Sequence, residues 1–392
     1  MISKWNGVLK MNYSGFAIRK KRLENNWSQE GLCKGICTVS YLSKIEQGKA
    51  DASEEVIAML FGKLGIEWIT DERILAEGKR FVEEWYDAVL SEDVKKISIL
   101  QEQFEKKFWI LENSSFAIDV FLLKALDSDE RGPLDEKLEV CMNSRQLSFQ
   151  RLLGGHFTEA EKLYPSAFIY LRAGYAAYEK GDNFLALEKL QKAYELASEE
   201  GRVRVMMMAK LYTTNCYSNI GDIEFMEYHG KIAKRLALTL DEHGYAETVD
   251  YNFFATKIEV GDYKEAYDYF SSLAEPSAES LHKLAVCCEK LGKIEEAFAA
   301  IERVKNAKSE REEVKKLSEN ACEMIRFRLL HEDYLSNAEY GKILLEFFDF
   351  CRRELPIGYA KFHLPWVLEW YTANRQYKLA YELLNNFPNN IK

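Results

Sequence analysis

The sequence contains few residues that break helices and few patterns that build strands. Only 6 of its 392 residues are proline, and long alternating runs rich in Val, Ile and Thr are absent. Apolar residues instead recur at helical spacing along nearly the whole chain, which predicts an almost all-α protein. With 47% hydrophobic and 30% charged residues, the composition is typical of a soluble globular protein with two or more domains.

Other absences exclude whole classes of protein. No apolar run reaches the ~20 residues of a membrane-spanning helix, and no signal peptide opens the chain, so we expect a cytoplasmic protein without a membrane partner. The six histidines are scattered, and the motifs H-E-x-x-H, G-x-S-x-G and G-x-x-x-x-G-K-[ST] are missing. We therefore expect no enzymatic activity, no cofactor and no metal.

The eight cysteines show neither a disulfide pattern nor a metal-binding pattern. They lack C-x-x-C spacing and lie on apolar helical faces, at positions 33, 37, 141, 216, 287, 288, 322 and 351. Cys33 and Cys37 are close in sequence, but no histidine lies near them to complete a zinc site. Reduced cysteines in the protein interior are the simplest interpretation.

Charge is distributed unevenly in this acidic chain, whose formal net charge is −10. Residues 1–70 contain 10 Lys+Arg and 7 Asp+Glu, whereas the rest of the chain contains 43 and 56. A basic segment in front of an acidic body indicates that contact with nucleic acid is confined to the N-terminal part.

Four short helices are predicted in residues 13–64. The first has a basic outer face, and the residues before Met11, which could equally be the start, show no pattern. Ser28 and Thr38 are placed as N-caps of the second and third helices, and Gly48 ends the third. A tight turn between the second and third helices is the arrangement that lays one helix in the major groove of DNA.

The residues around this turn match a known motif in type and spacing. They are Ser28, Gln29, Leu32, Cys33, Ser40, Leu42, Ser43, Lys44, Ile45, Glu46 and Gly48. The segment resembles the phage-repressor-type (XRE) helix-turn-helix family. Gln29 and Glu46 are 17 residues apart, one fewer than in the common repressor pattern, and this spacing resembles the peptide-regulated Rgg, PlcR, PrgX and NprR group of quorum-sensing regulators.

The resemblance implies that the third helix reads double-stranded DNA. Five residues would face the groove: Thr38, Val39, Ser40, Tyr41 and Lys44. Five would lie near phosphates: Arg19, Lys21, Gln29, Ser43 and Lys49. The family also implies that Arg22 pairs with Glu46 inside the domain, that Leu32, Leu42 and Ile45 belong to its core, and that a homodimer reads a two-half-site operator.

Three domains are expected along the chain. Residues 11–70 would form the DNA-binding domain, 71–140 a helical connector and 141–392 a repeat domain. The connector is predicted as two amphipathic helices, 72–90 and 92–111, that are rich in Trp and Phe and contribute to a dimer contact.

An internal repeat follows the connector. Gly-Asp pairs stand at 181, 221 and 261, and similar turns are centred on Gly155, Gly292 and Arg375. Five residues after most of these turns comes a small residue: Ala160, Ala186, Ala266, Ala297 and Ala380, with Met226 as the exception. The pattern resembles tetratricopeptide repeats, which are helical hairpins stacked into a superhelix. The aromatic stretch 344–371 is either the core of the last repeats, which we favour, or a self-association surface.

In tetratricopeptide proteins the first helices of the hairpins line a concave surface on which peptides bind. Counting back from the turns, the resemblance implies a peptide site at Tyr175, Tyr178, Asn215, Asn219, Tyr251, Asn252 and His282. Asn215 has the position of the asparagine that clamps the peptide backbone in that family. The alternative is that Asn215 and Asn219 are solvated or bridge adjacent helices, and that the tyrosines only pack.

Together these features predict a homodimeric transcription regulator whose repeat domain binds a short signalling peptide that alters operator binding. The alternative is a regulator of the same build whose repeat domain docks a protein partner.

Overall fold

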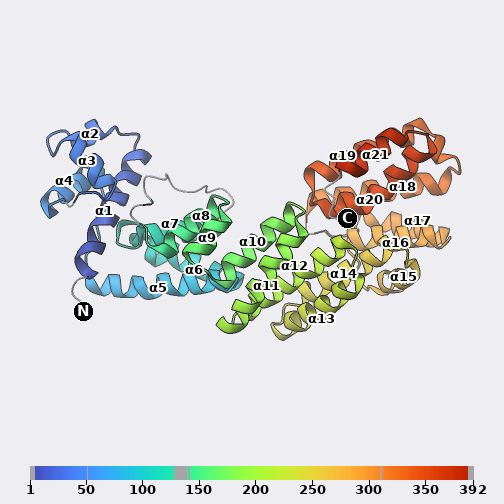
Figure 1. Cartoon of the computed structure of the whole chain (residues 1–392), viewed down its shortest axis with the longest axis horizontal. Coiled ribbons are helices and arrows are strands. Elements are labelled where there is room, and N and C mark those ends of the chain that lie inside the picture. Colours follow the sequence, from blue (N-terminus) through green and yellow to red (C-terminus); the bar gives the residue numbers. More distant parts are fainter. Residues whose placement is uncertain (1–4, 51, 128–138, 140–141, 310, 387–392) are drawn as a thin grey trace. The chain divides into compact units, whose positions relative to one another are not determined.

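The computed structural model describes residues 5–50, 52–127, 139, 142–309 and 311–386. Every regular element in these ranges is a helix (Figure 1), which confirms the predicted all-α class. Two compact units divide the chain: Met1–Ala173 with Glu195–Val205, and Gly174–Tyr194 with Met206–Lys392. The three-domain division stays a prediction, and its boundary between residues 140 and 141 lies outside the described residues.

The first unit begins with the four helices of the DNA-binding region, continues with those of the predicted connector, and includes the first two helices of the predicted repeat domain. They are α1 (Trp5–Glu24), α2 (Gln29–Cys33), α3 (Val39–Glu46), α4 (Glu54–Leu64), α5 (Glu72–Leu90), α6 (Val94–Gln103), the π-helix η1 (Phe104–Phe108), the 3-10 helix η2 (Trp109–Asn113), α7 (Ala117–Asp127), α8 (Ser144–Leu153) and α9 (Phe157–Leu163).

Antiparallel hairpins follow. Their helices are α10 (Ala167–Glu179), α11 (Asn183–Glu200), α12 (Val203–Ile220), α13 (Ile223–Thr239), α14 (His243–Glu259), α15 (Tyr263–Ser272), α16 (Ala278–Lys290), α17 (Ile294–Val304), α18 (Glu312–Leu330), the 3-10 helix η4 (Tyr334–Ser336), α19 (Ala338–Glu354), α20 (Ile357–Ala373) and α21 (Tyr377–Asn386).

The first helix differs from the prediction in its start. It begins at Trp5 rather than at Tyr13. Gly15 lowers the helical signal of the sequence but is required by packing, because a Cβ there would lie 2.2 Å from the carbonyl oxygen of Ile45 in α3. The close approach of α1 to α3 therefore requires glycine at position 15.

The caps and the core of the DNA-binding region agree with the sequence. Ser28 and Thr38 each accept a hydrogen bond from a backbone N–H in the first turn of their helices. Leu32, Leu42 and Ile45 are buried, which confirms their predicted role in the core. Polar caps at both helix starts fix the turn that separates α2 from α3.

The second helix of the connector differs from the predicted one. Instead of one helix over 92–111, α6 gives way to a π turn and then a 3-10 turn. The wider turn lets two phenylalanines pack on the same side of α5, with Phe108 stacked on Phe81 at 4.1 Å between ring centroids and Phe104 at 5.6 Å from Trp85. Tertiary packing thus overrides the regular helical period here.

The hairpin turns have the backbone that the repeat pattern predicts. The turn residues all adopt positive φ, from 56° to 89°: Gly155, Gly181, Gly221, Gly261, Gly292 and Arg375. Gly174 allows close helix packing as expected, because a Cβ there would lie 2.8 Å from Leu190 Cγ. Between α18 and α19, where the repeat signal is weak, a short 3-10 helix replaces the glycine turn.

The C-terminal aromatic stretch is core. Phe347, Phe348, Phe362 and Trp366 are buried in one cluster that spans α14 to α20. The seven cysteines in the described residues are all free and mostly buried, which agrees with the prediction. Cys141 lies outside these residues.

Candidate functional site

The position of the recognition helix α3 is fixed by a buried carboxylate at its last residue. Glu46 accepts hydrogen bonds from Arg22 on both oxygens, at 2.6 and 2.9 Å, which confirms the predicted pair. Gln29 Nε2 donates to the same carboxylate at 2.8 Å, and Arg22 also donates to the backbone oxygen of Trp27 at 2.8 Å. The network ties α1, α2 and the end of α3 together by charge-assisted bonds.

The residues expected to read DNA are the N-cap and four residues of α3. Val39, Ser40 and Lys44 are exposed, and Tyr41 is half-buried. Thr38 is exposed, but its hydroxyl caps α3 by accepting from the N–H of Tyr41 at 3.2 Å. Their contact with bases stays a prediction.

Of the residues expected near phosphates, two have mainly structural contacts. Arg19 is 7% exposed, and its guanidinium lies 3.7 Å from Glu46, so it faces the domain interior and we do not retain it in the interface. The Gln29 amide is engaged with Glu46. Lys49 is exposed, whereas Lys21 is half-buried and pairs with Glu24 at 3.3 Å.

Ser43 on α3 and Lys63 on α4 complete this surface. The Ser43 hydroxyl accepts from Gln47 at 3.0 Å. The Lys63 ammonium donates to the backbone oxygens of Gly31, Leu32 and Lys34 at 2.9 to 3.1 Å. A cation at the C-terminus of α2 stabilises that short helix.

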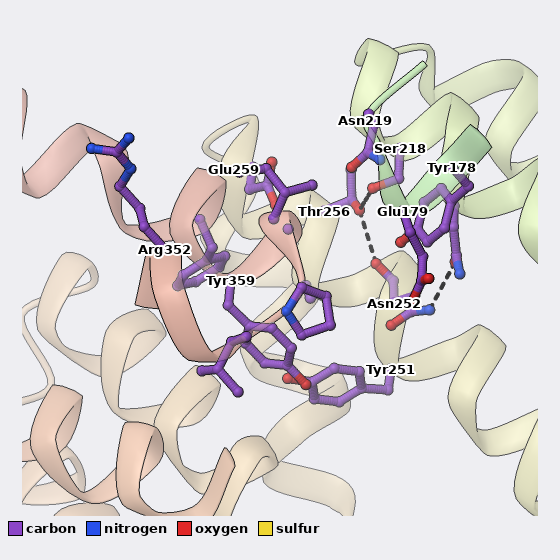
Figure 2. A pocket seen from close by; sticks show the side chains of 18 of the residues that line it. Tyr178, Glu179, Ser218, Asn219, Tyr251, Asn252, Thr256, Glu259, Arg352 and Tyr359 are labelled. Atoms are coloured by element: carbon purple, nitrogen blue, oxygen red, sulfur yellow. Dashed lines mark hydrogen bonds between the residues drawn. The ribbon is translucent and has the colours of Figure 1, made fainter. Parts of the chain in front are cut away.

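A cavity of about 710 Å³ opens in the second unit. Six of the seven residues predicted to bind peptide line it: Tyr175, Tyr178, Asn215, Asn219, Tyr251 and Asn252. Figure 2 shows residues of α10, α12 and α14 converging on the cavity, with Tyr359 of α20 on the other side. The structure therefore brings these residues together, and ligand contact stays a prediction.

Pairs of asparagines join neighbouring helices at the cavity, and all of these residues except Asn183, at the start of α11, line it. Asn252 Nδ2 on α14 donates to Asn215 Oδ1 on α12 at 3.0 Å, and Asn219 Nδ2 donates to Asn183 Oδ1 at 3.2 Å. Next to the first pair, the hydroxyls of Ser218 and Thr256 are 2.7 Å apart. The asparagines thus bridge helices, as the alternative interpretation expects, and also line the cavity.

Tyrosines supply the apolar part of the wall. The rings of Tyr175 and Tyr178 pack on Tyr212 at 4.9 and 6.0 Å. Burial raises the pKa of Tyr178 and of Tyr251 above the usual value for a phenol, so both hydroxyls stay protonated and can donate hydrogen bonds. Rings with polar ends among amides suit an extended ligand that is partly apolar.

The opposite wall comes from the C-terminal hairpins. Lys361 on α20 donates to the backbone oxygens of Ser218 and Asn219 at 2.9 and 3.1 Å and lies 3.3 Å from Glu259. The lysine sits at the C-terminal end of α12, where a helix has unpaired carbonyls. Residues 143 positions apart therefore meet next to the cavity.

His282 does not belong to this site. It is buried and stacks on His363 at 5.2 Å between ring centroids, and it does not line the cavity. Its neighbour Lys283 does. Lys283 stands nine residues before its turn glycine, Gly292, just as Asn252 stands nine residues before Gly261. His282 instead shares the offset of Tyr251, which is ten residues. Counting with the offset of Asn252 would therefore have predicted Lys283.

Sequence analysis missed several other lining residues, namely Ser218, Thr256, Glu259, Arg311, Arg352 and Tyr359. Those of the C-terminal wall carry no local signal, since only folding brings them near α12 and α14. Across the described ranges, no group of three or more His, Cys, Asp or Glu side chains could hold a metal ion. No helix in the part of the chain that the structure describes has the length and hydrophobicity needed to cross a membrane.

Comparisons with known proteins identify the N-terminal region. A search among curated proteins gives no significant match. Among solved structures, the chain is similar to the crystal structure of NprR in complex with its cognate peptide NprX, with a TM-score of 0.49, 17% sequence identity, and coverage of 81% of this chain and 100% of that chain. NprR is one of the regulators named in the group that the sequence resembles. The helix-turn-helix family model matches residues 18–68, so the N-terminal region of this chain is a helix-turn-helix domain.

Proposed function

We propose that this chain is a sequence-specific transcription regulator, acting as a homodimer, whose helical-repeat region binds a short peptide that alters its affinity for DNA. The helix-turn-helix domain supports the DNA-binding part, since α3 exposes Val39, Ser40 and Lys44 on a helix that the Arg22–Glu46 pair holds in place.

The observation that carries the peptide part is the Asn215–Asn252 pair in the cavity. One amide N–H of Asn252 and the Oδ1 of Asn215 are used between the two side chains. Both residues line the cavity, and the Asn215 amide group and the Asn252 Oδ1 remain as a donor and an acceptor. A peptide bond presents the complementary acceptor and donor, so this pair suits the backbone of an extended peptide whatever its sequence. A cavity volume of about 710 Å³ falls within the usual range for ligand sites.

Native mass spectrometry of the full-length protein purified from its own host tests the peptide part. The expected result is a dimer carrying the additional mass of a peptide of roughly 5–10 residues, released on denaturation. A dimer that binds DNA and carries no such mass, and that binds no short peptide encoded beside its gene in isothermal titration, would instead favour docking of a protein partner.

The DNA part is tested with a double variant, Ser40→Ala with Lys44→Ala. DNA selected from random duplexes by the wild-type protein serves as the probe. Loss of both exposed contacts should reduce its affinity by at least about tenfold, while the far-ultraviolet circular dichroism stays unchanged. Lys290→Ala, an exposed lysine of α16, is the control and should bind like the wild type. Lost helicity in the double variant would show that the two residues are structural.

Coupling between the two parts is tested with Asn215→Ala. The variant should bind the selected DNA like the wild type without peptide but respond at least about tenfold more weakly to the peptide found by mass spectrometry, because one amide–backbone hydrogen bond and its orienting partner are lost. An unaltered peptide response would remove Asn215 from the site.

A further inference from the structure

A buried lysine without a bonded partner faces the cavity. Lys283 on α16 is 4% exposed and is among the lining residues. Its ammonium lies 3.1 Å from the ring centroid of Phe362. No residue in the described ranges accepts a hydrogen bond from Lys283 or forms an ion pair with it, and the nearby Glu259 is engaged with Lys361 at 3.3 Å. The cavity therefore contains a cation whose charge the protein itself leaves unpaired.

Burial of an unpaired ammonium is costly, and proteins retain such groups mainly where the charge is used. The charged and titratable groups that interact with Lys283 are Glu259 of α14, Glu279, His282 and Cys287 of its own helix, Cys322 of α18, Cys351 of α19 and His363 of α20. Burial outweighs the attraction of the two glutamates and lowers the pKa of Lys283 to about 7. A negative charge brought into the cavity would reverse this effect.

The remaining charges of the cavity also favour an anionic partner. Besides Lys283, its wall carries four cations, Lys180, Arg311, Arg352 and Arg353, and three carboxylates, Glu179, Glu259 and Glu354. Residues outside the lining pair with charges of both signs: Lys361 with Glu259 at 3.3 Å, Asp349 with Arg353 at 2.9 Å and Glu313 with Arg311 at 4.0 Å. The lining itself carries five basic residues and three carboxylates, in a chain of net charge −10.

We infer that the cavity selects ligands that present a carboxylate to Lys283, next to the Asn215–Asn252 pair. The inference rests on the proposed peptide binding and specifies the chemistry of the peptide. The carboxylate is either the C-terminus of the peptide or an Asp or Glu side chain. The Lys283 ammonium packs on the Phe362 ring and the residue is 4% exposed, so an ion pair formed there is stronger than one at a surface.

Affinity selection with four pools of random heptapeptides tests this inference. One pool has free C-termini and contains Asp and Glu, the second has the same residues but amidated C-termini, the third has free C-termini without Asp or Glu, and the fourth carries no carboxylate. Full-length protein should retain the fourth pool at least about tenfold less than the best of the others. The second and third pools distinguish the two sources of the carboxylate.

Two variants assign the preference to Lys283. Lys283→Met keeps the length of the side chain and should lose the preference for carboxylates, whereas Lys283→Arg should keep it. Lys290→Met, an exposed lysine of the same helix, is the matched control and should behave like the wild type. If Lys283→Met fails to fold, the comparison of the four pools on the wild-type protein still decides the inference.

Calorimetry with a peptide recovered from the selection gives an independent measurement. At pH 8 the free lysine is mostly neutral, and pairing with a carboxylate raises its pKa, so binding should take up protons. Titrations in two buffers of different ionisation enthalpy reveal this uptake, which Lys283→Met should abolish. Equal retention of the fourth pool, or uptake that is unchanged in Lys283→Met, overturns the inference and leaves peptide binding intact. Retention of no pool overturns both the inference and the proposed peptide binding.

Discussion

Replacing Glu46 with Leu is expected to destabilise the helix-turn-helix domain by about 3–5 kcal/mol. The Glu46 carboxylate is completely buried and accepts three hydrogen bonds, two from Arg22 and one from Gln29. Three charge-assisted bonds contribute roughly 1.5–3 kcal/mol each, and the lower desolvation cost of the leucine offsets part of that sum. What remains is largely the cost of leaving the buried Arg22 guanidinium with only the Trp27 carbonyl as a partner.

The assay is amide hydrogen exchange by mass spectrometry on the full-length protein at pH 7. A local probe is needed because a chain with two compact units does not unfold in one step. Protection in α1, α2 and α3 should fall by at least about a hundredfold, whereas the helices of the second unit should not change. Glu24→Gln, which removes only the surface pairs with Lys20 and Lys21, is the control in the same domain and should have little effect.

A double variant separates the cost of an unpaired charge from the loss of a necessary contact. Arg22→Met with Glu46→Leu removes both partners of the buried pair and leaves Arg19, whose guanidinium lies 3.7 Å from Glu46 in the wild type, as the remaining cation there, so it should recover a large part of the lost protection. Wild-type protection in Glu46→Leu alone would refute the reasoning, as would a double variant that is as unstable as the two single variants added together.

Two further predictions concern a close packing contact and a buried histidine. Gly15→Ala should raise the helix propensity of α1 by roughly 1 kcal/mol. It should nevertheless weaken DNA binding and lower the stability of the domain, because the new Cβ would lie 2.2 Å from the backbone oxygen of Ile45. A more stable variant with normal DNA binding would contradict the close contact. Burial and the Lys210 ammonium lower the pKa of His229 from 6.5 to about 4. The unfolded chain therefore binds a proton there that the folded chain does not, so α12 and α13 should lose stability as the pH falls through this window. Hydrogen exchange should show this loss in the wild type and less of it in His229→Phe, and equal loss in both would exclude His229 as its source.

Local features of the DNA-binding region could be predicted from the sequence. Capping residues act over a few positions, so Ser28 and Thr38 could be predicted from the sequence, whereas the Arg22–Glu46 pair was implied only by the family resemblance. The predicted start of α1 was too late because the residues before Met11 show no apolar pattern, and the π turn at Phe104–Phe108 was not predicted because packing on α5 breaks the helical period. Arg19 was expected near phosphates, yet its guanidinium lies 3.7 Å from Glu46.

Part of the cavity lining could also be predicted from the sequence, because the repeat turns are local features. Tyr175, Asn215 and Tyr251 belong to repeats with clear turns, so counting residues placed them on one face of successive hairpins, and the structure brings them together at one cavity. A shift of one residue in this count changes which side chain is predicted to line the cavity, and the count gave the buried His282 instead of Lys283.

By itself, the sequence determined which segments are helical, where the hairpins turn and which domain binds DNA, because these depend on periodicity, caps and a local motif. Only the tertiary structure decided which charges remain unpaired. Lys361 finds two carbonyls at the end of α12, whereas Lys283 finds only the Phe362 ring. Both are lysines on helices of the second unit, and what distinguishes them is the set of groups that helices distant in sequence place around them.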